Sequence, residues 1–348
     1  MKILYAVQGT GNGHLSRARD VIPLLKNIGE VDILVSGTQA DMTLPYDVKY
    51  QMKGLGFIFG KRGGVDLWKT FIQNNIRGII REIQKVPVHQ YDVVINDFEP
   101  VSAWACYFKR RPCIALSHQC AVLAVNAPLP KHRDRIGRLI LKYYAPSTVK
   151  YGFHFSSFND QTYTPVIRRQ VRELFVSNNG HYTVYLPSYS DKKLIKILSR
   201  FSDIKWEVFS KHNRKAYDCG NVFLKPVHNE AFLESMASSK GILCGAGFET
   251  PSEALFLKKK LLVVPMENQY EQHCNAAALK VLGVTVLKNL KKKQFPKIRE
   301  WLNTESLIQV DFPDITEEII QTLLNNHFIT NLSAVNQSFL GSIDSPVN

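Results

Sequence analysis

The chain has 348 residues, of which 45% are hydrophobic, and its formal net charge is +14 at pH 7. The apolar content argues against a disordered chain, and the length suggests two domains of ordinary size with a cleft between them. No apolar run reaches the roughly 18 residues of a membrane-spanning helix, and no targeting segment precedes the first glycines, so a cytoplasmic protein is expected. The charge excess is +11 in residues 1–170 and +3 in residues 171–348, which suggests an anionic partner of the first half.

Short apolar runs alternate with longer amphipathic segments up to about residue 290, as in β-α-β units on a parallel sheet. Strands of the first half are predicted at residues 2–7, 31–36, 48–52, 93–96, 113–117 and 152–156. The clearest helix between them is predicted at residues 67–84. The fold class is therefore α/β.

The second half repeats this design. Its strands are predicted at residues 182–186, 205–209, 222–225, 241–244, 260–264 and 284–287. Its helices are predicted at residues 191–201, 229–236, 251–257, 269–282 and 316–325.

A polar stretch between the halves, residues 158–179, marks the boundary between two Rossmann-like domains that face each other across a cleft. We predict an N-terminal domain of residues 1–165 and a C-terminal domain of residues 166–326. The tail, residues 327–348, either packs back on the first domain or is disordered.

The first predicted strand leads into "GTGNGH", which ends at His14. Glycines between a strand and a helix let backbone N–H groups approach an anion. The spacing G-x-G-x-G-H matches neither the dinucleotide pattern G-x-G-x-x-G nor a phosphate loop ending in G-K-S/T. The loop is either a tight strand-to-helix turn or an anion site. His14 is either a surface or helix-capping histidine or a residue that contacts a phosphate and takes a proton.

The fourth predicted strand is followed by "NDFEP", which places Asp97 and Glu99 at its end. Two carboxylates there could form a metal pair, supply a general base, or lie as charges at a helix N-terminus. The six cysteines form no C-x-x-C pair, so they are expected to be reduced thiols without zinc.

Basic clusters occupy residues 109–111 and 131–138, and "RIGRLILKYYA" (residues 135–145) mixes basic with apolar side chains. The clusters either face anionic lipid or form an ordinary solvated surface, and the mixed segment is either interfacial or a core helix. No nucleic-acid-binding motif is recognisable, so no nucleic-acid partner is expected.

The second half contains "LCGAGFETPSEALFLKKKLLVVPMENQYEQHCNAAALKVLG", residues 243–283. A strand ends in a glycine turn, and Thr250 with Pro251 opens a helix that carries Glu253. The amides ahead of this helix suit a diphosphate, and the Glu253 carboxylate could accept two hydrogen bonds from a ribose diol. Alternatively, Glu253 is an exposed helix carboxylate and Gln272 is a capping residue.

This order of elements resembles the donor-nucleotide motif of the GT-B glycosyltransferases. It is most similar to the family 28-like enzymes that transfer N-acetylglucosamine from its UDP sugar to lipid-linked muramyl-pentapeptide, and to related macrolide and glycolipid transferases. "GTGNGH" resembles their loop G-G-T-G-G-H, and "PCIALSHQ" (residues 112–119) resembles their strand ending in a histidine. The resemblance covers most of the chain in the right order.

The resemblance implies a GT-B fold and a role for each matching residue. The donor would contact Gly245, Gly247, Phe248, Thr250, Glu253, Glu271, Gln272 and Asn275. The acceptor would contact Gly9, Thr10, Gly11, Asn12, Gly13 and His118. Glu271 replaces a glutamine of the muramyl-pentapeptide enzymes, so the donor sugar need not be N-acetylglucosamine.

The expected reaction is transfer of a hexose or N-acetylhexosamine from a nucleotide sugar, UDP-linked, to an acceptor hydroxyl, with inversion and without a metal or other cofactor. His14 is the first candidate for the base and Asp97 the second. The acceptor is expected to be lipid-linked or phosphate-bearing, with the protein working in cell-envelope synthesis at the inner face of an anionic membrane. The alternatives are a UDP-sugar 2-epimerase of the same fold and a non-catalytic nucleotide-sugar or nucleic-acid binding protein.

Overall fold

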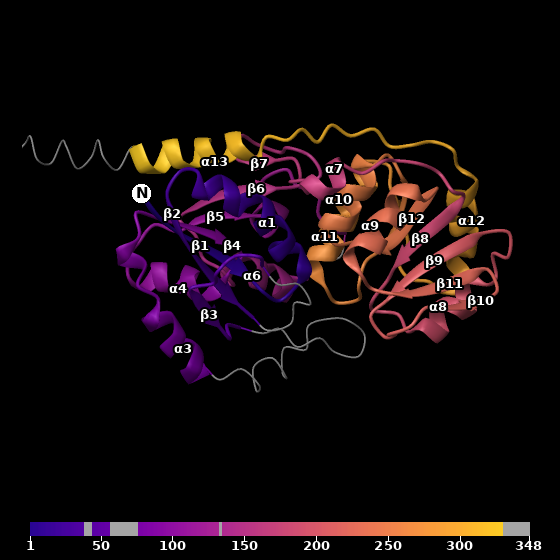
Figure 1. Cartoon of the computed structure of the whole chain (residues 1–348), viewed down its shortest axis with the longest axis horizontal. Coiled ribbons are helices and arrows are strands. Elements are labelled where there is room, and N and C mark those ends of the chain that lie inside the picture. Colours follow the sequence, from indigo (N-terminus) through magenta and orange to yellow (C-terminus); the bar gives the residue numbers. More distant parts are fainter. Residues whose placement is uncertain (38–43, 56–75, 132–133, 330–348) are drawn as a thin grey trace, which may run out of the picture.

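The computed structural model describes residues 1–37, 44–55, 76–131 and 134–329. Figure 1 shows two α/β lobes, the first built from the N-terminal half and the second from the C-terminal half. Part of the helix predicted at 67–84, part of the basic cluster 131–138 and most of the tail 327–348 lie outside the described residues.

The first lobe is built on a parallel sheet with the strand order β3-β2-β1-β4-β5-β6-β7. Its strands are β1 (Lys2–Gln8), β2 (Glu30–Ser36), β3 (Tyr50–Met52), β4 (Val93–Asp97), β5 (Ile114–Ser117), β6 (Val149–Phe153) and β7 (Thr162–Tyr163). The order reverses between β1 and β4, and the carboxyl ends of strands at such a point open a crevice for ligands. Because β1 and β4 are buried on both faces, they read as continuous apolar runs.

The helices of this lobe follow its strands in sequence. They are α1 (Asn12–Lys26), α3 (Ile76–Lys85), α4 (Pro100–Phe108), α5 (His118–Val122) and α6 (Arg135–Tyr143), with a short 3-10 turn η1 (Val88–Gln90). The short helix α7 (Arg169–Arg172) lies in the segment that leads to the second lobe. Helix α1 begins inside the glycine cluster, with Gly11 as its N-cap.

The second lobe has the strand order β10-β11-β9-β8-β12-β13-β14. Its strands are β8 (His181–Tyr185), β9 (Lys205–Ser210), β10 (Tyr217–Cys219), β11 (Val222–Pro226), β12 (Gly241–Gly245), β13 (Lys260–Val264) and β14 (Thr285–Val286). Its remaining elements are α8 (Asp191–Leu198), α9 (Asn229–Ser238), α10 (Glu249–Phe256), α11 (Tyr270–Val281), η2 (Lys292–Gln294) and α12 (Phe295–Asn303). The chain then continues into α13 (Thr316–Leu324) and η3 (Asn325–Ile329). Two α/β units with mainly parallel sheets confirm the predicted fold class.

Three strands differ from the sequence prediction, and one of them is β7, a two-residue strand that was not predicted and that pairs in parallel with β6. Strand β10 was not predicted; it pairs antiparallel with β11 through a tight turn at Gly220, whose φ is +65°. The strand predicted at 152–156 is β6 and begins earlier, with Val149 beside Ile114. The apolar pattern misplaced it because His154 and Phe155 remain buried beyond the end of the strand.

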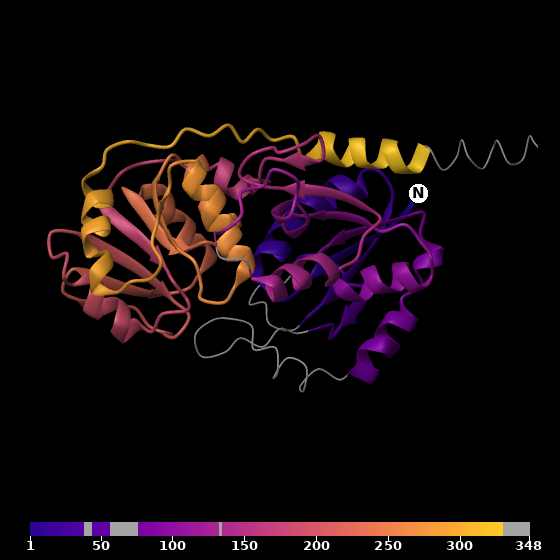
Figure 2. The same ribbon diagram turned by 180° about the vertical axis from the view of Figure 1, so that it is seen from behind.

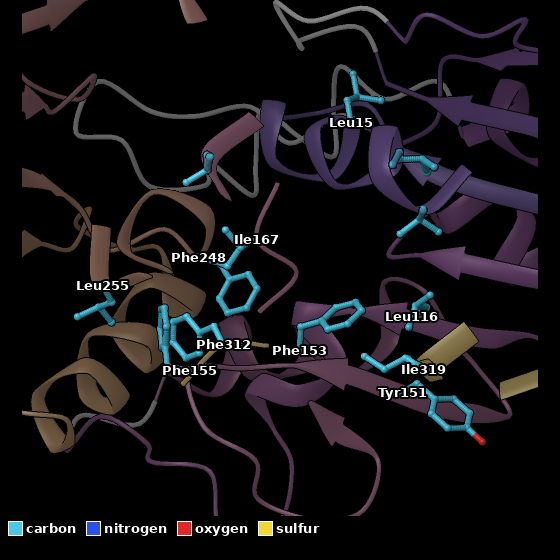
Figure 3. Close-up of a cluster of buried hydrophobic side chains, with 14 of the residues drawn as sticks. Leu15, Leu116, Tyr151, Phe153, Phe155, Ile167, Phe248, Leu255, Phe312 and Ile319 are labelled. Carbon is cyan, nitrogen blue, oxygen red and sulfur yellow. The ribbon is translucent and has the colours of Figure 1, made fainter. Parts of the chain in front are cut away.

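The two lobes share one apolar core. Figure 3 shows Phe153, Phe155 and Ile167 near Phe248 and Leu255, which belong to the second lobe. The rings of Phe155 and Phe248 lie 5.2 Å apart between centroids. This apolar contact stabilises the docked arrangement of the two lobes, because separating them would expose aromatic side chains to water.

Helix α13 lies on the first lobe although its sequence follows the second. It packs against α1, and Figures 1 and 2 show it along the N-terminal sheet after a segment that crosses both lobes. Ile319 and Leu323 are buried there, and Tyr151 lies 2.9 Å (Oη to Nε2) from His327, the first residue of the predicted tail. Within the described residues, no helix combines the length and the apolar character needed to cross a membrane.

Two buried histidines make the stability of the protein depend on pH. Burial lowers the pKa of His154 to about 2 and also lowers the pKa of His118, whose ring centroid lies 5.2 Å away. Both groups bind a proton more weakly when folded than when unfolded, where the pKa is about 6.5. Their contribution is therefore complete above that pH and is lost as the pH falls below it.

We expect His154 to make the free energy of unfolding fall by about 1.4 kcal/mol per pH unit below pH ~6.5, and His118 to lower it in the same direction. Urea unfolding at a series of pH values measures this slope. The His154→Gln variant should have a shallower slope, whereas the variant of exposed His89, His89→Gln, should keep it. Equal slopes in wild type and His154→Gln would contradict the assignment.

Candidate active site between the two sheets

A cavity of about 500 Å³ lies between the lobes at the carboxyl ends of β1 and β4. Eight of the residues predicted from the sequence line it: Thr10, Gly11, Gly13, His14, Gly247, Phe248, Glu271 and Gln272. The other predicted residues do not line it: Gly9, Asn12, Asp97, His118, Gly245, Thr250, Glu253 and Asn275. The glycine turns of both lobes therefore reach one cavity, and the first turns of α1 and α10 both border it.

His14 lies at this cavity with its Nδ1 held by the first lobe. Its Nδ1 is 2.8 Å from Asp97 Oδ1, and because a carboxylate only accepts, Nδ1 is the donor, which leaves Nε2 as the acceptor of the neutral ring. The side-chain Nε2 of Gln119 lies 3.4 Å from His14 Nε2 and can donate a long, weak hydrogen bond to it. The imidazole thus presents a proton acceptor toward the cavity.

Asp97 is fully buried and forms an ion pair with Arg17. Arg17 Nε donates to Oδ2 at 3.0 Å and Nη2 donates to Oδ1 at 2.8 Å. Burial raises the pKa of the Asp97 carboxyl, but Arg17 and His14 outweigh it, and the pKa is lowered overall. Asp97 is therefore an ionised partner of His14, and it lies behind the imidazole rather than in the cavity wall.

Glu99 has a different role from its neighbour. Its two carboxylate oxygens accept hydrogen bonds from the backbone N–H groups of Val101 and Ser102, each at 2.6 Å, so Glu99 is the N-cap of α4. The sequence left three roles open for Asp97 and Glu99: a metal pair, a general base, or charges at a helix N-terminus. Glu99 takes the third of these roles. The described residues contain no group of three or more His, Cys, Asp or Glu side chains arranged to hold a metal ion.

His118 and Asn275 join the two lobes beside the cavity. His118 Nδ1 lies 2.8 Å from the carbonyl oxygen of Phe153, and Nε2 lies 2.8 Å from Asn275 Oδ1. The His118 ring stacks on Phe248 with centroids 3.8 Å apart and planes 6° apart. Asn275 also donates to the carbonyl oxygen of Ala246, so this set fixes the glycine turn of the second lobe.

Glu253 is buried against Arg168, in the segment between the lobes. Both carboxylate oxygens accept from Arg168, at 2.5 and 2.8 Å. Burial raises the pKa of Glu253, an effect that the Arg168 charge opposes without reversing. Each oxygen keeps a lone pair for a further donor. Thr250, half-buried in the first turn of α10, lies one turn before Glu253.

Glu271 and Gln272 begin α11 at the opposite wall of the cavity. Gln119 Nε2 donates to Glu271 Oε2 at 3.3 Å, while Gln272 Oε1 accepts from the backbone N–H of Met266 at 3.0 Å. Helix α6 forms the remaining apolar wall with Ile136 and Ile140. No residue of α6 is buried, so α6 is not a core helix.

Sequence reasoning missed Arg17, Gln119 and Glu249. Arg17 lies three residues after His14, a spacing that places both side chains on one face of α1, and this was the available signal. Arg17 Nη1 donates to Glu249 Oε1 of the second lobe at 2.8 Å. No pattern in the sequence indicated that contact, because it joins residues of different domains.

Comparison with known sequences identifies a family. Residues 1–304 match the profile of glycosyl transferase family 1. No curated protein sequence matches the chain.

Solved structures share the fold at low sequence identity. The spinosyn rhamnosyltransferase SpnG in complex with thymidine diphosphate is 12% identical, with a TM-score of 0.53 over 95% of this chain and 96% of that one. MurG of Acinetobacter baumannii is 14% identical, with a TM-score of 0.50 over 86% and 91%. A UDP-N-acetylglucosamine 2-epimerase is 13% identical, with a TM-score of 0.51 over 94% and 96%. At these identities the likeness supports the GT-B fold alone.

Proposed function

This chain belongs to glycosyl transferase family 1, and from that premise we propose that it transfers a hexose or N-acetylhexosamine from a UDP-linked sugar to an acceptor hydroxyl. The observation that carries the proposal is the cavity in which the glycine turns of both lobes meet His14. A cleft between two α/β domains is a common place for a nucleotide ligand. For the donor motif, we follow the resemblance of residues 243–283 to the family 28-like enzymes.

The donor side of the proposal rests on the start of α10. The glycine turn before it leaves open space at Gly247, where a Cβ atom would meet nothing within 4 Å. Backbone amides at a helix N-terminus favour a diphosphate and stabilise the charge that develops on it when the sugar leaves. We assign the ribose to Glu253, the base to the vicinity of Phe248, and the sugar to Glu271 and Gln272.

UDP should bind to the purified protein, and Glu253→Gln should weaken that binding by about tenfold because a ribose hydrogen bond to a carboxylate is charge-assisted. Calorimetric titration measures both affinities. The matched control is Glu234→Gln, an exposed position on α9 of the same lobe, which should bind UDP as wild type does. Equal affinity in Glu253→Gln would remove Glu253 from the donor site.

On the acceptor side, we propose His14 as the general base. The acceptor hydroxyl gives its proton to His14 Nε2 as its oxygen bonds to the anomeric carbon of the sugar. The bond from that carbon to the diphosphate breaks in the same step, which inverts the anomeric centre. Asp97 holds the imidazole and stabilises its charged form, as a buried carboxylate behind a histidine does. We propose no metal or other cofactor in this step.

His14→Gln should lower kcat for transfer by at least about a hundredfold, because general-base catalysis contributes factors of that order. UDP affinity should stay within about threefold of wild type, since His14 belongs to the opposite lobe. Turnover of a radiolabelled sugar donor with a membrane extract as acceptor source measures the first quantity, and calorimetry measures the second. Near-normal turnover in His14→Gln would exclude it as the base.

We further propose that the acceptor is lipid-linked and that the protein contacts an anionic membrane through α6. Ile136 and Leu139 are each 54% exposed on this helix, and Ile136 also lines the cavity. Arg135 and Arg138 flank them and line an adjoining cavity. An amphipathic helix with apolar and basic side chains suits the surface of a negatively charged bilayer.

Vesicles that contain phosphatidylserine should carry the protein upward in a flotation gradient, and vesicles of phosphatidylcholine alone should not. Leu139→Glu should reduce flotation by about tenfold. The carboxylate cannot enter the apolar layer of the bilayer, and the anionic lipid headgroups repel its charge. Leu307→Glu, at an exposed apolar residue of the second lobe, is the control. Flotation that is independent of lipid charge or of Leu139 would refute this surface.

A further inference from the structure

We propose that Glu249 of the second lobe is a positioning residue for His14: through the guanidinium of Arg17, it fixes the Asp97–His14 pair while the two lobes are docked. The proposal rests on the function proposed above for His14. It concerns a contact between lobes that neither the sequence motifs nor the reaction assigns.

Arg17 is the centre of this contact. Its side chain is only 3% exposed, and its pKa is raised because the charges of Asp97 and Glu249 outweigh the effect of burial. Nε and Nη2 of the guanidinium donate hydrogen bonds to Asp97, while Nη1 donates across the cleft to Glu249. A buried guanidinium requires partners for its donors, so its orientation is set by both carboxylates together.

The lobes are shaped to admit the Glu249 carboxylate. A Cβ atom at Gly13 would lie 2.5 Å from Glu249 Oε2 and 2.6 Å from its Cδ, so the side chain occupies the space that a larger residue at 13 would fill. The third glycine of "GTGNGH" therefore makes room for a carboxylate of the other lobe. This carboxylate lies by the first turn of α1, where the helix dipole favours a negative charge.

The consequence for His14 follows from the shared guanidinium. Arg17 Nη2 bonds to the same Asp97 oxygen that holds His14 Nδ1, at 2.8 Å in each case. If Glu249 withdraws, Arg17 loses one anchor and can turn about its bonds to Asp97, and the carboxylate turns with it. The imidazole is then less firmly directed at the cavity, so docking of the second lobe prepares the site in the first.

The test is solvent exchange of the His14 Nδ1 proton, followed by NMR in full-length protein labelled with ¹⁵N-histidine. The His14→Gln spectrum assigns the resonance. Glu249→Ala should accelerate exchange by about tenfold or more, because the partly buried hydrogen bond from His14 to Asp97 opens more often. The matched control is Glu173→Gln, which removes an exposed carboxylate paired with Arg169 and should leave the exchange rate unchanged.

A second variant approaches the contact from the other lobe and keeps both charges. Gly13→Ala should displace the Glu249 side chain and accelerate exchange in the same way, and alanine within α1 favours the helix, so this variant should fold. The double variant should exchange no faster than Glu249→Ala alone, because both changes break one link. Wild-type exchange in both single variants, or equal acceleration in Glu173→Gln, would overturn the proposal.

The exchange measurement needs no substrate and therefore separates the two proposals. Unchanged exchange would remove the role of Glu249 and leave the proposed transfer standing. Transfer that survives in His14→Gln would remove His14 as the base and leave the link between the lobes.

Discussion

The arrangement of the cleft depends on one buried cation, the guanidinium of Arg17. Burying a charge is costly unless its donors are matched by acceptors, and here the acceptors come from two lobes, Asp97 from the first and Glu249 from the second. Because Asp97 also holds His14, the ion pair that reduces the cost of burial in the first lobe also sets the direction of the imidazole. Removing either carboxylate would leave Arg17 with an unmatched charge in an environment poor in water.

The remaining contacts between the lobes are consistent with this constraint. Arg168 holds Glu253 beside the connecting segment, and His118 holds Asn275 while its ring stacks on Phe248. Each pair joins a residue of the first lobe or the connecting segment to the region around α10 and α11. Three of the residues proposed for donor binding, Phe248, Glu253 and Asn275, thus also dock the lobes, and a ligand between the lobes would meet an arrangement that docking has already set.

The fold was predictable from the sequence because parallel strands that are buried on both faces leave continuous apolar runs, as in β1 and β13. The short antiparallel β10 left no such signal, since its residues are largely exposed. At the site, His14 and the glycine turns were found because they are local motifs. Arg17 and Glu249 were not, since their importance arises from a contact between positions 232 residues apart in the chain. The placement of Phe248 in the shared core likewise depends on packing between lobes, which no local pattern reports.

The cavity is proposed to bring a nucleotide sugar to an acceptor hydroxyl. The most direct measurement is mass spectrometry of the products after the protein is incubated with a panel of nucleotide sugars and a lipid extract. Transfer predicts one glycosylated product and an equal amount of UDP, both absent when the acceptor extract is omitted. Release of an epimerised sugar without any acceptor would contradict transfer and show that the protein is a 2-epimerase, and unchanged donors throughout would refute the transfer itself.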